Sequence, residues 1–135
     1  MSHFSTVKTC LREQVLIEQA LTQLGHSFQT GEHLVVEGEK NEQAQVQIAV
    51  SLKGAKSKKL QLGFAKTADG AFEACGEWYN VERATGLSRQ EFLNSVRRAY
   101  AQLAVKRQAT ELGYVVESEK VLATGEIELV ISESV

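Results

Sequence analysis

The sequence predicts an α+β fold in which an antiparallel sheet carries two helices packed on one face. Three observations predict it. Ser88 and Glu91 have the spacing of a capping box, and an apolar stripe follows them at three- and four-residue steps, as in a long helix. Residues 45–52 alternate apolar and polar side chains, which indicates a strand with only one buried face. Residues 114–119 and 126–132 have the pattern of a β-hairpin.

The first part of the chain supplies a strand, a helix and a hairpin. Residues 4–9 are β-prone and roughly alternating, which predicts a first strand. Residues 11–24 have the apolar face of a short helix, and a glycine ends it. Two short segments, 26–30 and 33–37, suit a hairpin that turns at Gly31.

The middle of the chain continues the sheet. In the strand at 45–52, one face is expected to hold Val46, Ile48, Val50 and Leu52. Residues 60–64 resume the alternation, and a turn at Asp69 leads into a strand over 72–78. A loop then joins this strand to the long helix at 88–112.

An internal similarity bears on the topology. Residues 21–29 read like residues 109–117, and each segment ends a helix and starts a pair of strands. Two strand-helix-strand-strand units on one continuous antiparallel sheet would explain the match. Chance convergence explains it equally well, because helix C-termini commonly read Leu-Gly. In either case the length suits a single domain spanning residues 1–135.

Composition limits the classes of partner. Fifteen basic and 17 acidic residues give a formal charge of -2, so no overall field recruits nucleic acid or an anionic membrane. Apolar runs are only a few residues long, and the first residues lack the charged leader and apolar segment of a signal peptide. We therefore expect no membrane association and a cytoplasmic location.

Catalytic, cofactor and metal sites are not predicted. The sequence lacks the GxSxG, GxxxxGK and GxGxxG motifs. His3, His26, His33, Cys10 and Cys75 do not have the clustered spacing of zinc ligands. Both cysteines are expected to be buried thiols. A redox role for Cys75 is an alternative, and it requires a reactive thiol with a low pKa.

The long helix carries a second apolar stripe, about half a turn from the first. Its members are Ala101, Val105, Ala109 and Leu112. Packing by the chain's own hairpin or first helix is the ordinary explanation for such a stripe. An interface with another protein, or with a second copy in a homodimer, is the alternative.

Two further segments are candidate contacts. Trp78 and Tyr79 lie where a strand runs into a loop, and such rings can anchor a partner protein. Closure of the end of the core by Trp78 is an equal alternative. Within 14 residues the chain also carries five lysines, a candidate nucleic-acid contact: Lys53, Lys56, Lys58, Lys59 and Lys66. A solvated loop is favoured there, because no aromatic residue falls between Lys53 and Lys59 to stack on bases.

Residues across the chain resemble a known family. They are residues 1–9, Gly63-Phe64, Gly70, Phe72, Glu77-Trp78 and Leu112-Gly113-Tyr114. These are similar to the hypothetical chloroplast open reading frame thirty-five family, a domain of unknown function from cyanobacteria, plastids and other bacteria. The resemblance implies a small soluble α+β protein with no established activity, and a stromal location if it is encoded in a plastid. Glu39 and Glu77 depart from the family pattern, which has an aromatic residue and an aspartate there.

These observations together favour a non-catalytic adaptor or assembly factor that binds another protein. Its expected contacts are Trp78 and Tyr79 with the stripe formed by Ala101, Val105 and Ala109. A nucleic-acid-associated protein that uses the loop from Lys53 to Lys66 is the alternative.

Overall fold

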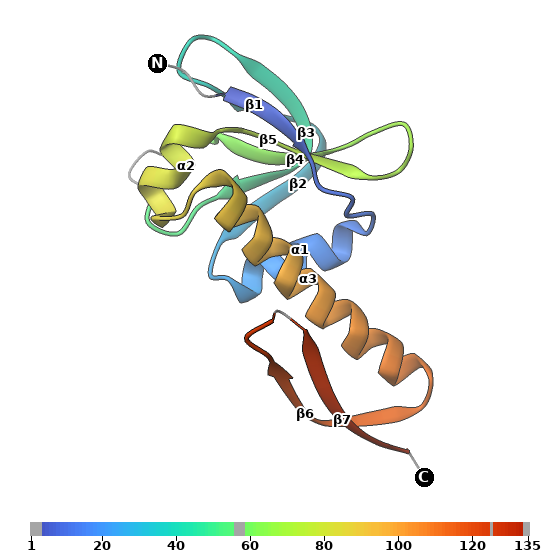
Figure 1. Cartoon of the computed structure of the whole chain (residues 1–135). Helices are drawn as coiled ribbons and strands as arrows, with labels where there is room; N and C mark the ends of the chain where they lie inside the picture. The colour runs from blue at the N-terminus through green and yellow to red at the C-terminus, as the bar shows by residue number, and fades with distance from the viewer. Residues whose placement is uncertain (1–3, 56–58, 125, 134–135) are drawn as a thin grey trace.

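A five-stranded antiparallel sheet with helices on one face forms the body of the molecule (Figure 1). The computed structural model describes residues 4–55, 59–124 and 126–133. In the sheet, the strand order is β1-β5-β4-β3-β2. The strands are β1 (Phe4–Lys8), β2 (Ser27–Glu37), β3 (Gln43–Ser51), β4 (Leu62–Lys66) and β5 (Phe72–Glu77). The helices are α1 (Gln14–Gln23), α2 (Trp78–Thr85) and α3 (Arg89–Glu111). A hairpin of β6 (Tyr114–Val121) and β7 (Ile127–Glu133) follows α3.

The predicted α+β class is confirmed. Helices α1 and α3 pack against each other and share one apolar core with the central strands. The largest side chains that this core buries completely include Ile17, Leu21, Phe64, Phe72 and Phe92. In the described part of the chain, no helix is long and apolar enough to cross a membrane.

The predicted start of the long helix is also confirmed. Ser88 Oγ accepts a hydrogen bond from the Glu91 amide at 3.1 Å, and Glu91 Oε1 accepts one from the Ser88 amide at 3.0 Å. These two bonds satisfy donors that have no partner within the helix. The bond from the Ser88 amide, and secondarily an interaction with the Ser88 side chain, holds the pKa of Glu91 below its ordinary value.

The sheet curls back on itself. β1 and β2 are its opposite edges, yet the residues that follow β2 reach β1 and β5. A Cβ on Gly38 would lie 2.9 Å from Phe4 Cδ2, so a larger residue there would require the Phe4 side chain to shift. The Glu39 amide donates to Glu77 Oε2 at 3.1 Å, which ties the two ends of the curl together.

This curl encloses a second, smaller core, which corrects the prediction of one buried face. Its buried members are Val36, Val46, Ala49 and Cys75. Ala49 alternates along β3 with Ile48 and Val50, which belong to the main core, so the second core lies on the opposite face. Val46 was predicted to share a face with Ile48 and Val50, and the structure places it in the second core instead.

Two further predictions are wrong in detail. Segments 26–30 and 33–37 are not a hairpin but belong to one strand, β2, because both pair with β3. Gly31 lies where the register shifts, between Thr30 and Leu34. Residues 78–85 form a helix, α2, where a loop was expected.

The sheet is also not continuous. β6 pairs with β7 in a separate two-stranded sheet, so these two strands do not extend the five-stranded sheet.

Candidate interaction surfaces

Trp78 and Tyr79 differ sharply in exposure. Trp78 is 5% exposed, and its Nε1 donates to the Ser5 carbonyl oxygen at 3.0 Å. Its ring lies 6.4 Å from that of Phe92, centroid to centroid, so it closes the end of the main core. Tyr79 is 51% exposed, with the Arg83 guanidinium 5.7 Å from its ring centroid. At this corner, Tyr79 is therefore the ring available to a partner.

The second stripe of α3 is divided between packing and exposure. Ala109 is 6% exposed, whereas Val105 is 39% and Leu112 is 67% exposed, and Ala101 is exposed as well. Lys106, one turn before Ala109, forms an ion pair with Glu119 of β6 at 3.1 Å. The chain's own hairpin therefore covers Ala109 and leaves the rest of the stripe open.

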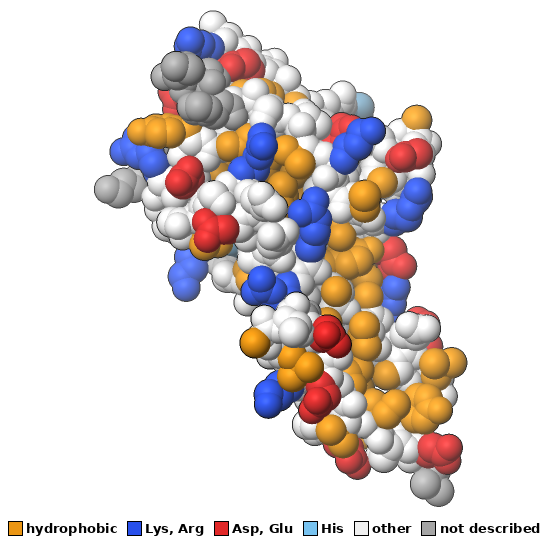
Figure 2. All heavy atoms as spheres, viewed as in Figure 1, with side chains coloured by type: hydrophobic (Ala, Val, Ile, Leu, Met, Phe, Trp, Pro, Cys, Tyr) orange, Lys and Arg blue, Asp and Glu red, His pale blue; other side chains and the backbone are white. Residues whose placement is uncertain are grey.

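The C-terminal part of α3 and the hairpin together project from the body, and we call residues 101–133 the arm (Figure 1). Nine large apolar side chains are exposed in the described part of the chain, and six of them belong to the arm. These six are Val105, Leu112, Val115, Val121, Val130 and Ile131. Figure 2 shows hydrophobic side chains gathered where α3 meets the hairpin. The exposed apolar surface is thus concentrated in about a quarter of the chain.

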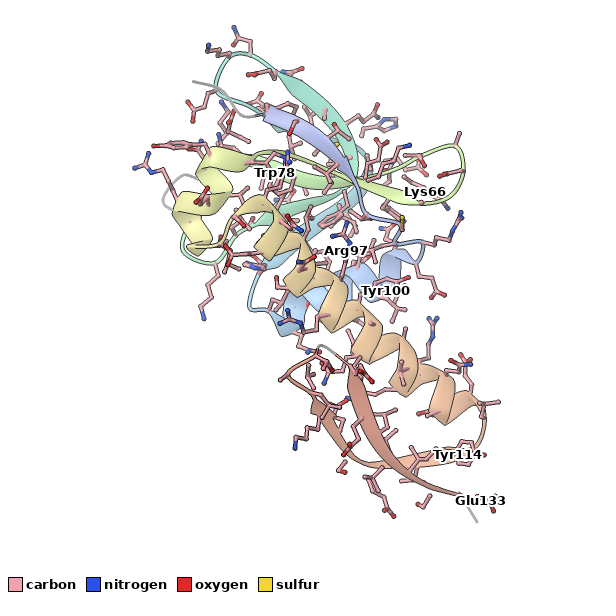
Figure 3. The ribbon with its side chains drawn as sticks, viewed as in Figure 1. Lys66, Trp78, Arg97, Tyr100, Tyr114 and Glu133 are labelled. Carbon is pink, nitrogen blue, oxygen red and sulfur yellow. The ribbon has the colours of Figure 1, made fainter. Side chains whose placement is uncertain are left out.

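The predicted lysine cluster is not one surface. Lys66 lies at the far end of β4, on the side of the molecule away from Trp78 and α2 (Figure 3). Lys59 donates to the Gly38 carbonyl oxygen at 3.1 Å and lies 3.8 Å from a Glu37 carboxylate oxygen. Lys56 and Lys58 lie outside the described residues. Of the three described lysines of this cluster, Lys53 and Lys59 line hollows beside α2, and Lys66 lies on the other side of the molecule.

A polar cavity lies beside that part of the loop. It has a volume of about 450 Å³, and its lining includes Glu39, Lys59, Gln61, Asn80 and Arg83. The Asn80 amide donates to Glu39 and to Gln61, and the bond to Glu39 is the main reason that the pKa of Glu39 is lowered. Sequence reasoning missed this network, because its members come from three separate segments.

Of the candidate metal ligands, His3 lies outside the described residues. Among the described residues, no three His, Cys, Asp or Glu side chains are grouped to hold a metal ion. Burial raises the pKa of the Cys75 thiol, which is the opposite of what a reactive thiol needs. Cys10 is exposed, which corrects the prediction that both cysteines are buried.

His26 has a structural role. Its Nδ1 accepts from the Lys53 amide at 3.0 Å, and its ring lies 5.6 Å from that of Phe92, centroid to centroid. Burial, and secondarily the charge of Lys53, lowers its pKa.

Comparison with known proteins gives one match. The model of a family described as "Protein of unknown function (DUF1257)" matches residues 20–130. No curated protein and no solved structure shows significant similarity to the chain. The matched segment covers α2, α3 and the end of α1, with four strands of the sheet and nearly all of the arm. The chain therefore belongs to the DUF1257 family of proteins of unknown function.

Proposed function

We propose that this protein is a non-catalytic adaptor or assembly factor that binds another protein through its arm. The observation that carries the proposal is the concentration of exposed apolar side chains there, six of nine in the described chain. Contiguous exposed apolar surface is a common mark of a protein interaction site. Isolated two-stranded hairpins are also marginally stable in water, so a partner that covered the hairpin would stabilise it.

The corner at Tyr79 is a second contact in this proposal. Beside the exposed ring lies a groove of about 590 Å³, lined in part by Phe4, Tyr79, Glu82 and Arg89. A tyrosine ring buries a large area at a small cost in conformational entropy. Trp78 supports the corner from inside through its bond to Ser5, and it contributes little contact area of its own.

The alternative, nucleic-acid binding, has weaker support. Lys59 and Arg83 flank the polar cavity, where they could contact phosphate groups. The carboxylate of Glu39 lies in the same cavity, and its negative charge would repel phosphate groups. Lys66 lies on the side of the molecule away from Trp78, the first residue of the helix that carries Arg83, so it does not enlarge this basic surface.

We also propose that the protein belongs with the hypothetical chloroplast open reading frame thirty-five proteins, on the residues that resemble them. With this assignment goes a cytoplasmic location, or a stromal one if the gene is in a plastid.

Affinity capture with mass spectrometry tests the proposal. Tagged full-length chain is used as bait in native-host lysate, with and without nuclease. The three baits are wild type, Val105→Glu and Val15→Glu. Val15 is 59% exposed on α1, so its substitution introduces the same charge outside the arm. We expect a protein that survives nuclease, remains with Val15→Glu and falls at least tenfold with Val105→Glu. Loss of the captured material on nuclease treatment would favour the nucleic-acid alternative.

A further inference from the structure

The two sheets have four outer strands, and three of them are poor templates for a further strand. At β1, the Ser5 carbonyl oxygen accepts from Trp78 and the Lys8 carbonyl oxygen from Arg97, so side chains already occupy backbone acceptors of this strand. β2 carries a register shift between Thr30 and Leu34. Such shifts interrupt the regular row of backbone groups that strand addition requires.

The hairpin has one irregular strand and one regular strand. β6 shifts register between Val116 and Ser118, whereas every residue of β7 from Ile127 to Glu133 is paired in succession. Among the described elements, β6 is the only one with extensive contacts to β7. The outer edge of β7 is therefore the one long, uninterrupted strand edge among the described residues.

Register fixes which side chains flank this edge. Glu119 pairs with Leu129 and reaches Lys106 of α3, so the hairpin face that holds these residues is turned toward α3. Ile127, Leu129 and Ile131 of β7 belong to that face by alternation. Glu128 and Val130 lie on the opposite face, where Val130 is 47% exposed.

Charge around the edge is strongly negative. Residues 114–133 contain five glutamates and one lysine, although the whole chain is close to neutral. Glu126, Glu128 and Glu133 lie on β7 or directly before it. Opposite charges in cross-strand pairs stabilise a sheet, and like charges destabilise it. A strand added beside β7 would therefore favour lysine or arginine on the face of Glu128 and apolar residues on the other face.

From this edge and its charge we infer that β7 binds an extended segment of a partner protein as a third strand of the hairpin sheet. In that segment, basic and apolar residues alternate. The inference rests on the proposed function and specifies the chemistry of the partner. Main-chain hydrogen bonds supply affinity in this mode, and alternate side chains supply specificity. A second copy of this chain fits less well, because its own β7 would bring a second set of glutamates to the interface.

Synthetic peptides test the inference directly. The probe is a fluorescent seven-residue peptide that alternates lysine and valine, and anisotropy measures its binding to the full chain. One control peptide has glutamate in place of lysine. The other carries methyl groups on alternate backbone nitrogens, which therefore cannot donate main-chain hydrogen bonds. The chain variants are Glu128→Lys and, as a matched control on the edge strand β2, the exposed Glu32→Lys.

We expect the lysine-valine peptide to bind, and both control peptides to bind at least tenfold more weakly. Reversing one cross-strand charge pair should weaken binding by about tenfold in Glu128→Lys, with less than a twofold change in Glu32→Lys. Equal binding of the methylated peptide, or no binding by the lysine-valine peptide at about 1 mM, would overturn the inference. A stable dimer of the free chain that Glu128→Lys dissociates would also overturn it. If capture in lysate still depends on Val105 in any of these cases, the proposed function stands without strand addition.

Discussion

Replacing Ala109 with glutamate would separate the stability of the arm from that of the body. Ala109 is 6% exposed and lies beneath the hairpin, one turn from the Lys106 that pairs with Glu119. A glutamate there must either bury its carboxylate between α3 and the hairpin or displace the hairpin. An unpaired buried carboxylate costs several kcal/mol. We therefore expect the hairpin to move away from the helix.

The size of the effect follows from what holds the hairpin. The side chains of Lys106 and Glu119 are 40% and 29% exposed. An ion pair exposed to this extent contributes at most about 1 kcal/mol to stability. The two-stranded sheet adds little stability of its own. We expect the free energy of local opening of β6 and β7 to fall by about 3 kcal/mol, which corresponds to a roughly 100-fold loss of amide protection.

Hydrogen exchange followed by mass spectrometry measures this loss for each segment. Amides of β6 and β7 should exchange faster in Ala109→Glu, while those of β3, β4 and β5 should keep their protection. Ala101→Glu is the matched control, because Ala101 is exposed on the same helix and a charge there meets solvent. Unchanged protection in the hairpin, or an equal loss in the central strands, would refute this view of how the arm is held.

Three other substitutions or reactions have defined outcomes. Burial keeps the folded-state pKa of His26 below its unfolded value. The associated stability is therefore present above about pH 6.5 and is lost as pH falls through the folded pKa. In urea titrations from pH 8 to pH 5, the free energy of unfolding should change less with pH for His26→Gln than for wild type. Glu77→Ala should lower the free energy of unfolding by about 1–3 kcal/mol, because the Glu39 amide loses a buried acceptor, and Glu77→Gln should lower it less, as measured by urea denaturation. Iodoacetamide should modify Cys10 in the native protein and spare Cys75 until the chain unfolds, and rapid labelling of native Cys75 would contradict the raised pKa of its thiol.

Local signals in the sequence predicted the parts of the fold that local contacts determine. The capping box at Ser88 and Glu91 joins residues three apart, so its spacing alone identified the start of α3. Helix α2 was missed because it follows β5 directly, without a side-chain cap, and buries only Trp78 and Val81. The face of Val46 was predicted wrongly because the curl of the sheet depends on contacts between distant segments, such as Gly38 with Phe4.

For the candidate surfaces too, the sequence predicted what local patterns determine and missed what distant contacts determine. The stripe on α3 could be predicted from its period, but its partial cover by the hairpin depends on how β6 folds back onto the helix. Likewise, the burial of Trp78 depends on Ser5, which is 73 residues away in sequence. The excess of glutamate in residues 114–133 was visible in the sequence. Its importance became clear only once the structure showed β7 as an open, regular edge.

Hydrogen exchange of the chain with and without its captured partner would test most directly whether the arm binds protein. The complex to compare is the one that wild-type bait retains after nuclease treatment. We predict slower exchange in β7 and in the adjoining part of α3, with residues 53–59 unchanged. Slower exchange confined to residues 53–59, with none in the arm, would contradict the proposed function and would place the contact at the lysine loop.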